Sequence, residues 1–215
     1  MAALSVIAVL AWTRPLLATP CAPGPGVAEP TAEARAANYL AVELAHREQF
    51  VEALALFRKA YELSPSYVIL FNIGRMAEKT GDAALAIRSY RCHVEEGGED
   101  VGPERKAEVL AAVARLRQAV AVLSVVADEP GLEVFVGGTS VGVAPVGEVF
   151  LNPGRVRVRV MRDPPEEREV SLAAGDSVRV EFERGSALTP PQTAPFRFPE
   201  ALVGSARVRT GIVAV

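Results

Sequence analysis

The sequence is poor in the residues that most often carry enzyme chemistry. Of its 215 residues, two are histidine, two are cysteine and one is tryptophan, and aromatic residues make up 6%. A catalytic site needs a nucleophile, a base or a set of metal ligands in a recognisable arrangement. The two histidines, His46 and His93, lie far apart in the chain, and neither has a second ligand at helical spacing. We therefore expect a protein that is not an enzyme and that holds no metal ion and no cofactor.

The two cysteines, Cys21 and Cys92, match no metal-binding or redox motif. Two cysteines in a chain of this length do not make a disulfide framework. Cys92 falls in a helical pattern, where a small buried apolar residue is the expected role. Cys21 falls in a segment that processing could remove.

A large excess of charge of one sign is also missing. The net charge is −3, with 12 basic and 14 acidic residues in 29–119 and 7 and 11 in 120–184. Nucleic acid and anionic membranes attract basic surfaces, and neither part of the chain is basic. We expect no nucleic-acid partner.

No hydrophobic run is long enough to cross a bilayer, and the longest comes at the N-terminus. Residues 2–12 form an apolar run of the length found in secretory signals, and small residues follow at Gly26-Val27-Ala28. No Lys or Arg precedes this run, and Pro20 disfavours a lipoprotein site at Cys21. The pattern predicts a signal peptide or a disordered N-terminus over residues 1–28. The protein is then periplasmic or associated with the cell envelope, or cytoplasmic if the segment is not a signal.

Residues 29–119 have the apolar spacing of three and four that is typical of helices. Thr31 can cap the first helix, Ser66 can cap the third, and Thr80-Gly81-Asp82 supplies a left-handed stop and a new cap. Pro103 stands at the favoured first turn of a further helix. An apolar seam of Val109, Val113, Leu116, Val120 and Leu123 indicates a helix that covers the open end of the bundle, or alternatively a short coiled coil.

The helices repeat along the chain. A shift of 33 residues places Ala53 on Ala86 and Phe57 on Tyr90. Over residues 34–97 the chain resembles the tetratricopeptide repeat family, and departs from it at Glu48 and His93. The residues that carry the resemblance are Ala53, Phe57, Ala60 and Pro65 in the first repeat and Gly74, Gly81, Asp82, Ala86 and Tyr90 in the second. It implies antiparallel helix pairs with a concave binding face.

From residue 120 the hydrophobic period changes to two. Six strands are predicted, at 120–127, 132–136, 147–151, 155–161, 167–173 and 177–183. Short strands at this density predict a small antiparallel β-sandwich. This part resembles a PEGA domain, a β-module of cell-envelope and surface proteins, through Glu129-Pro130-Gly131, Gly142, Ala144-Pro145, Pro153-Gly154 and Gly175.

The fold class expected from these patterns is α+β in two domains. A helical repeat domain occupies 29–119, a β-sandwich domain occupies 120–184, and a Pro-rich linker with an unassigned tail occupies 185–215. The tail contains Arg207 and Arg209, so it predicts no transmembrane span. The chain's oligomeric state is not indicated by any pattern.

Two surfaces are candidates for binding. The tetratricopeptide resemblance implies that a concave helical face holds a protein or peptide, through Arg35, Asn38 and His46 in the first repeat and Phe71, Arg75 and Glu78 in the second. The other candidate is a stripe formed by Arg155, Arg157 and Arg159, which a strand places on one face. Such a stripe suits an anionic glycan or envelope polymer, unless carboxylates on the neighbouring strands pair with it.

The leading hypothesis is a non-catalytic protein-binding or scaffold protein of the bacterial cell envelope. The alternatives are a glycan- or polymer-binding module with the β-domain as reader, and the regulatory part of a larger signalling protein.

Overall fold

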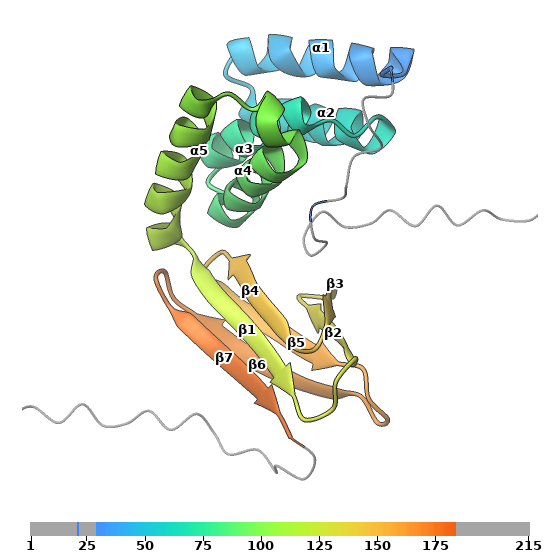
Figure 1. The fold of residues 1–215 in the computed structure, drawn as a ribbon, viewed down its shortest axis with the longest axis vertical. Helices are drawn as coiled ribbons and strands as arrows, with labels where there is room; N and C mark the ends of the chain where they lie inside the picture. The colour runs from blue at the N-terminus through green and yellow to red at the C-terminus, as the bar shows by residue number, and fades with distance from the viewer. Residues whose placement is uncertain (1–20, 22–28, 184–215) are drawn as a thin grey trace, which may run out of the picture. The chain divides into compact units, whose positions relative to one another are not determined.

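The computed structural model describes Cys21 and residues 29–183. The remainder of the expected signal segment, with its cleavage site, and the Pro-rich tail lie outside the described residues. Within the described part, five α-helices come first and seven strands follow (Figure 1). The helices are α1 (Ala32–His46), α2 (Phe50–Leu63), α3 (Tyr67–Thr80), α4 (Ala83–Gly97) and α5 (Pro103–Leu116). The strands are β1 (Ala121–Ala127), β2 (Glu133–Val136), β3 (Thr139–Val143), β4 (Val146–Leu151), β5 (Gly154–Val160), β6 (Glu166–Leu172) and β7 (Ser177–Phe182). The expected α+β class, helices before strands, is confirmed.

Local signals in the sequence account for most helix ends. The Thr31 hydroxyl accepts a hydrogen bond from the Ala34 amide, and the Asp82 carboxylate accepts one from the Leu85 amide. Gly81 ends α3 in the left-handed conformation, with φ of 82°, and Pro103 opens α5. Each satisfies or removes a backbone group that a helix terminus leaves without a partner. Ser66 stands at the N-cap of α3, but its side chain makes no capping bond.

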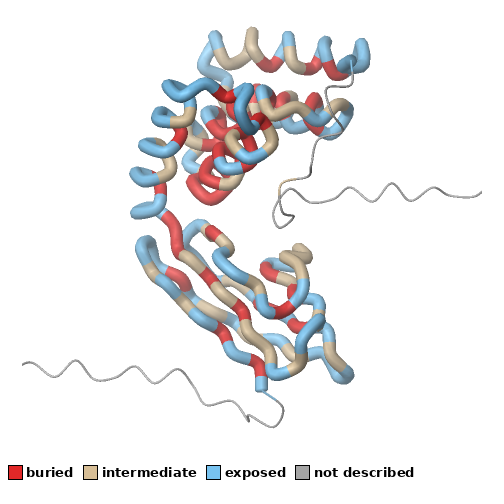
Figure 2. The backbone as a smooth tube through the Cα atoms, viewed as in Figure 1, coloured by how far each residue is buried: buried red, intermediate tan, exposed pale blue. Residues whose placement is uncertain are grey.

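The helices pack in sequence order around small residues, α1 on α2, α2 on α3 and α3 on α4. Ala53 and Ala86, which the 33-residue shift superimposes, are fully buried. At Gly74 a β-carbon would lie 2.6 Å from the ring of Tyr90, so only glycine lets α3 and α4 approach this closely. Figure 2 shows the resulting band of buried backbone within the helical part.

Helix α5 packs on α4, as expected of a helix that covers the end of the bundle. The helical part of its apolar seam ends at Leu116, earlier than the sequence pattern predicts. Val109 and Leu116 are buried in α5, a single 3-10 turn follows at Arg117–Ala119, and Leu123 already belongs to β1. The buried Val120 joins the helical core cluster, so the seam runs directly into the first strand.

The seven strands form a three-stranded sheet, in the order β4-β1-β7, and a four-stranded sheet, in the order β3-β2-β5-β6. The expectation of purely antiparallel pairing is wrong at one place, because β1 and β7 run parallel. Parallel neighbours need a long connection, and the whole four-stranded sheet lies in the chain between these two strands. The inner sides of the sheets share one apolar core, which includes Leu123, Val125, Val134, Val158, Val160 and Phe182.

Strand β3 was absent from the six that the sequence predicts. Its residues, Thr139–Val143, include Gly142 and are mostly half-buried, so they lack a clean alternation of apolar and polar side chains. Strands β2 and β3 form an antiparallel hairpin. Gly137 and Gly138 both have positive φ, 60° and 83°, which the tight turn between β2 and β3 requires.

Two side chains of the sheet region reach the helical region. Phe150 of β4 belongs to the helical core cluster, and Asn152 lies at the start of α4. The Asn152 side-chain oxygen accepts a hydrogen bond from the Ala84 amide, and its NH₂ group donates to Asp82. Asn152 therefore supplements the cap that Asp82 gives to α4.

The two cysteines are bonded to each other, which corrects the expectation that they are unrelated. Cys21 and Cys92 form a disulfide with their Cα atoms 5.1 Å apart, although 71 positions separate them in the chain. Spacing in sequence could not indicate this pair, because the folding of the helices decides which part of the chain passes beside Cys92. None of the helices in the described ranges is long and apolar enough to span a bilayer.

Candidate functional site

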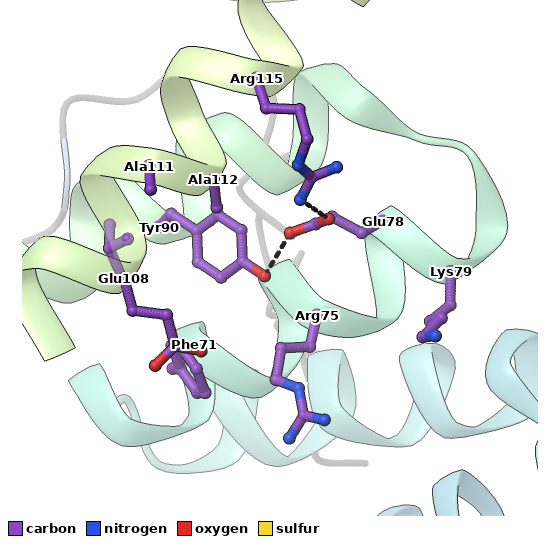
Figure 3. A pocket seen from close by; sticks show the side chains of 10 residues that line it. Phe71, Arg75, Glu78, Lys79, Tyr90, Glu108, Ala111, Ala112 and Arg115 are labelled. Carbon is purple, nitrogen blue, oxygen red and sulfur yellow. Dashed lines mark hydrogen bonds and ion pairs between the residues drawn. The ribbon is translucent and has the colours of Figure 1, made fainter.

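A hollow of the helical region lies between α3 and α5. It is a cavity of about 680 Å³ with Phe71, Arg75, Glu78 and Lys79 from α3 and Tyr90 from α4 (Figure 3). Helix α5 supplies the other side through Glu108, Val109, Ala111, Ala112 and Arg115. The small alanines keep α5 from filling the space, and a volume of this size suits several side chains of a bound segment.

A hydrogen-bonded chain crosses the cavity from α4 to α5. The Tyr90 hydroxyl donates to the Glu78 carboxylate at 2.7 Å, and Arg115 donates to the other oxygen of Glu78 at 2.6 Å. Burial, and then the bond to Glu78, raises the pKa of Tyr90 above its ordinary value, so the phenol keeps its proton. Glu78 is thus occupied within the protein and holds α3, α4 and α5 in fixed relation.

Two cations at the same cavity have no such partner. Arg75 and Lys79 are exposed on α3, one helical turn apart, and neither has a carboxylate partner among residues 29–183. Lys79 lies 5.7 Å from the centre of the Phe50 ring, and in Figure 3 Arg75 extends away from Glu78. The positive charge of this rim is therefore available to an outside group.

Phe71 lines the cavity but lies mostly beneath its surface. Its side chain is buried, with ring-centre distances of 5.7 Å to Tyr90 and 5.3 Å to His93. The guanidinium of Arg105 covers the ring at 4.0 Å, and Glu108 pairs with that guanidinium. Phe71 thus supports the floor of the cavity and offers little exposed area of its own.

The expected site residues of the first repeat are not at this cavity. Arg35 is exposed on α1 and lies 3.9 Å from Glu29, and His46 is exposed in the last turn of α1. Asn38 is half-buried, and its side-chain oxygen is enclosed without a hydrogen-bond partner among the described residues. The structure brings together the second-repeat trio of Phe71, Arg75 and Glu78, and leaves the first-repeat trio on a separate helix.

Sequence reasoning missed the half of the cavity that α5 supplies. Glu108, Ala112 and Arg115 follow one another at spacings of four and three, which places them on one face of a helix. That spacing indicates that the three residues share one face of α5, but the apolar seam of the same helix predicts only its packing. Lys79 carries a similar signal, since it follows Arg75 by four residues.

The arginine stripe lies on β5 as expected, and carboxylates of β6 face it. Arg155 is 3.6 Å from Glu169, and Arg157 and Arg159 are 3.7 Å and 2.7 Å from Glu167. The hydrogen bond from Arg159 and the charges of both arginines lower the pKa of Glu167 below its ordinary value. The antiparallel register sets Arg157 opposite Glu169 and Arg159 opposite Glu167, so pairing is built into the sheet.

No group of His, Cys, Asp and Glu in the described residues is arranged to hold a metal ion. No protein-family model matches the chain, and a search of curated proteins gives no match.

Proposed function

We propose that the chain is a non-catalytic binding protein whose cavity between α3 and α5 holds an acidic segment of a protein partner. The observation that carries this proposal is that Arg75 and Lys79, at the rim of a cavity of about 680 Å³, have no carboxylate partner among residues 29–183. Carboxylates of a partner would supply the charge that these side chains lack.

The rigidity of the cavity supports the same function. The chain of Tyr90, Glu78 and Arg115 joins three helices, so the surface is formed before a partner arrives. A preformed surface loses little conformational entropy on binding. Ala111 and Ala112, on the α5 side of the cavity, leave room for the partner's apolar side chains beside its carboxylates.

The proposal also assigns a repeat type to the helices and a module type to the sheets. Helices α1 to α4 act as two tetratricopeptide-type hairpins with α5 as their cap, and the two sheets act as a PEGA-like β-sandwich. Sequential packing of the helices and the closely packed Gly74–Tyr90 crossing support the first part. The apolar core that both sheets share supports the second. In this arrangement the β-domain serves as a spacer.

The alternative of a β-domain that reads an anionic polymer has less support. A polymer would have to displace Glu167 and Glu169 from Arg155, Arg157 and Arg159. Since those carboxylates belong to the same sheet, their pairing carries no cost of association, and an outside anion must compete with it.

The test uses the full-length protein and fluorescein-labelled peptides of about 12 residues that are acidic, neutral or basic. We expect acidic peptides to bind more tightly than neutral ones by about tenfold or more, with affinity that falls as salt rises. The paired substitution Arg75→Glu with Lys79→Glu reverses the rim charge at exposed positions, so it should abolish acidic-peptide binding and leave the circular dichroism spectrum unchanged.

The matched control is the triple substitution of Arg155, Arg157 and Arg159 by serine, which removes three cations from the sheet. We expect peptide affinity to stay within about twofold of that of the unmodified protein. If the triple variant loses peptide binding while the variant with Arg75→Glu and Lys79→Glu retains it, the proposal is overturned and a β-domain that binds an anionic polymer is favoured.

A further inference from the structure

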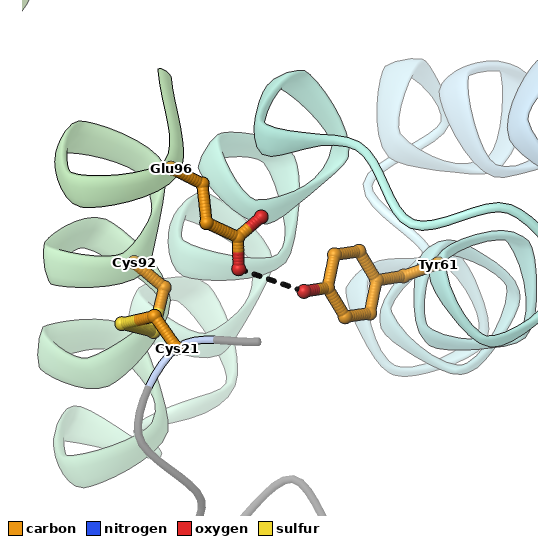
Figure 4. The surroundings of a disulfide bond; sticks show 4 residues. All are labelled: Cys21, Tyr61, Cys92 and Glu96. Atoms are coloured by element: carbon orange, nitrogen blue, oxygen red, sulfur yellow. Dashed lines mark hydrogen bonds between the residues drawn. A yellow bond between two sulfur atoms is a disulfide. The ribbon is translucent and has the colours of Figure 1, made fainter. Parts of the chain in front are cut away.

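The disulfide joins two parts of the helical region that the helix order keeps apart. Cys92 belongs to α4, is buried at 7% exposure and is bonded to Cys21 (Figure 4). Both cysteines pack in the apolar core of the helical region. Beside the bond, the Tyr61 hydroxyl donates to the Glu96 carboxylate at 3.0 Å, which links α2 to α4. The segment before α1 is therefore tied to α4, near the junction of the first and second helix pairs.

We propose that Cys21 remains in the mature protein, bonded to Cys92, and that the chain is oxidised after its export from the cytoplasm. The proposal does not rest on the peptide-binding function. It combines two independent features: the apolar run at residues 2–12, which has the length of a secretory signal, and a pair of cysteines that the fold brings within bonding distance.

The compartment follows from the chemistry of the bond. Disulfides persist in the periplasm and in other oxidising environments, and cytoplasmic thiols are kept reduced. Oxidation removes two electrons and two protons from the Cys21 and Cys92 thiols as the bond between their sulfur atoms forms. The disulfide of a dithiol oxidant accepts both and becomes two thiols. A chain that stayed in the cytoplasm would keep both thiols.

Processing is constrained by the same bond. The small residues Gly26-Val27-Ala28 offer a cleavage site by sequence, but cleavage there would detach Cys21 from α1. The cut would free the start of α1 from α4 even if the disulfide had already formed. We therefore place the mature N-terminus at or before Cys21, which excludes the site at residues 26–28.

Retention of Cys21 also gives the first helix pair a covalent tether. In a stack of repeats each helix pair contacts only its neighbours, so terminal pairs open most easily. The disulfide encloses a loop that contains α1, α2, α3 and most of α4, and a long loop restricts the unfolded chain strongly. Breaking the bond should lower the melting temperature by about 10 °C.

The first experiment determines the native N-terminus and the thiol state together. The full-length chain is expressed with its own N-terminus in a bacterium that secretes proteins into its periplasm, and free thiols are alkylated before lysis. We expect peptide mapping without reduction to recover the Cys21 and Cys92 peptides joined, neither alkylated, and an N-terminus no later than Cys21. An N-terminus beyond Cys21, or two alkylated thiols in the natively purified protein, overturns the proposal.

The second experiment tests the tether through melting temperature. Dithiothreitol should lower the melting temperature of the unmodified protein to that of Cys21→Ala, and it should leave the variant unchanged. Cys21 is only half-buried, so its replacement disturbs packing less than replacement of Cys92 would. Equal melting temperatures for the unmodified protein and the variant, without reductant, would show that no tether exists in solution.

Discussion

Arg75 and Lys79 on α3 and the arginines on the outer face of β5 each form a row of cations, but among the described residues only the β5 row has carboxylate partners. On β5 the register sets Arg157 and Arg159 opposite carboxylates of β6. On α3 the carboxylate between the two cations, Glu78, is turned to Tyr90 and Arg115. A count of charges along the sequence would rank the arginine stripe first. The difference shows that the number of cations in a stretch of sequence does not indicate how many of them the fold provides with a carboxylate partner.

The largest expected effect on stability concerns Phe71, which supports the floor of the cavity between α3 and α5. We expect Phe71→Ala to destabilise the protein by about 3–5 kcal/mol, because the ring is buried against Tyr90 and His93 and a cavity would replace it. Urea denaturation measures the loss. Phe71→Leu, which keeps most of the volume, should cost much less. A stable Phe71→Ala protein that no longer binds peptide would instead make this side chain a direct contact.

A smaller effect distinguishes a buried arginine of the β region from the exposed stripe. The Arg162 side chain is 8% exposed and lies 2.7 Å from Asp128 and 3.6 Å from Glu166. We expect Arg162→Ala to cost about 2 kcal/mol, because it removes a buried cation from two partly buried carboxylates, of which Glu166 keeps its pair with Arg168. Arg159→Ser removes a pair that water screens, so its stability should match the unmodified protein within experimental error. Comparable losses in urea denaturation of both variants would contradict this distinction.

Features fixed by local sequence could be predicted, and features fixed by tertiary contact could not. Thr31, Gly81 and Pro103 act within a few residues of their own position, so the helix ends they define were foreseen. The change of period at residue 120 likewise marks the passage from helix to strand.

The parallel pairing of β1 with β7 and the Cys21–Cys92 bond join residues that are far apart in the chain. No spacing rule indicates such pairs. For the candidate site, the α3 side could be predicted because the tetratricopeptide resemblance implies which helix of each pair lines the concave face. The α5 side depended on how the last helix docks, which repeat spacing does not determine.

The smallest expected effect on stability comes from His93, a buried titratable group that packs against Phe71 under the cavity between α3 and α5. Its Nδ1 lies 2.8 Å from the Tyr67 carbonyl oxygen, which can only accept, so Nδ1 carries the proton and donates. Nε2 is enclosed and has no hydrogen-bond partner among the described residues. Burial lowers the pKa of His93 below 6.5, and the hydrogen bond to Tyr67 opposes this shift in part. The nearby positive charge of Arg105 lowers the pKa further, against a smaller opposing effect of Glu108.

The sign of the pH effect follows from this lowered pKa. Between the folded pKa and about 6.5, the unfolded chain binds a proton at His93 that the folded protein does not, so stability falls as pH decreases through this window and levels off below the folded pKa. The raised pKa of Glu96, caused by burial, acts in the opposite sense, because its folded form holds a proton more readily.

The test therefore compares the pH dependence of the free energy of unfolding between variants. His93→Gln should lose the decline below about pH 7 in urea denaturation, since glutamine does not titrate. His46→Gln, at the exposed end of α1, should keep the decline. Parallel curves for the unmodified protein and His93→Gln would mean that His93 takes up its proton as easily in the folded protein as in the unfolded chain.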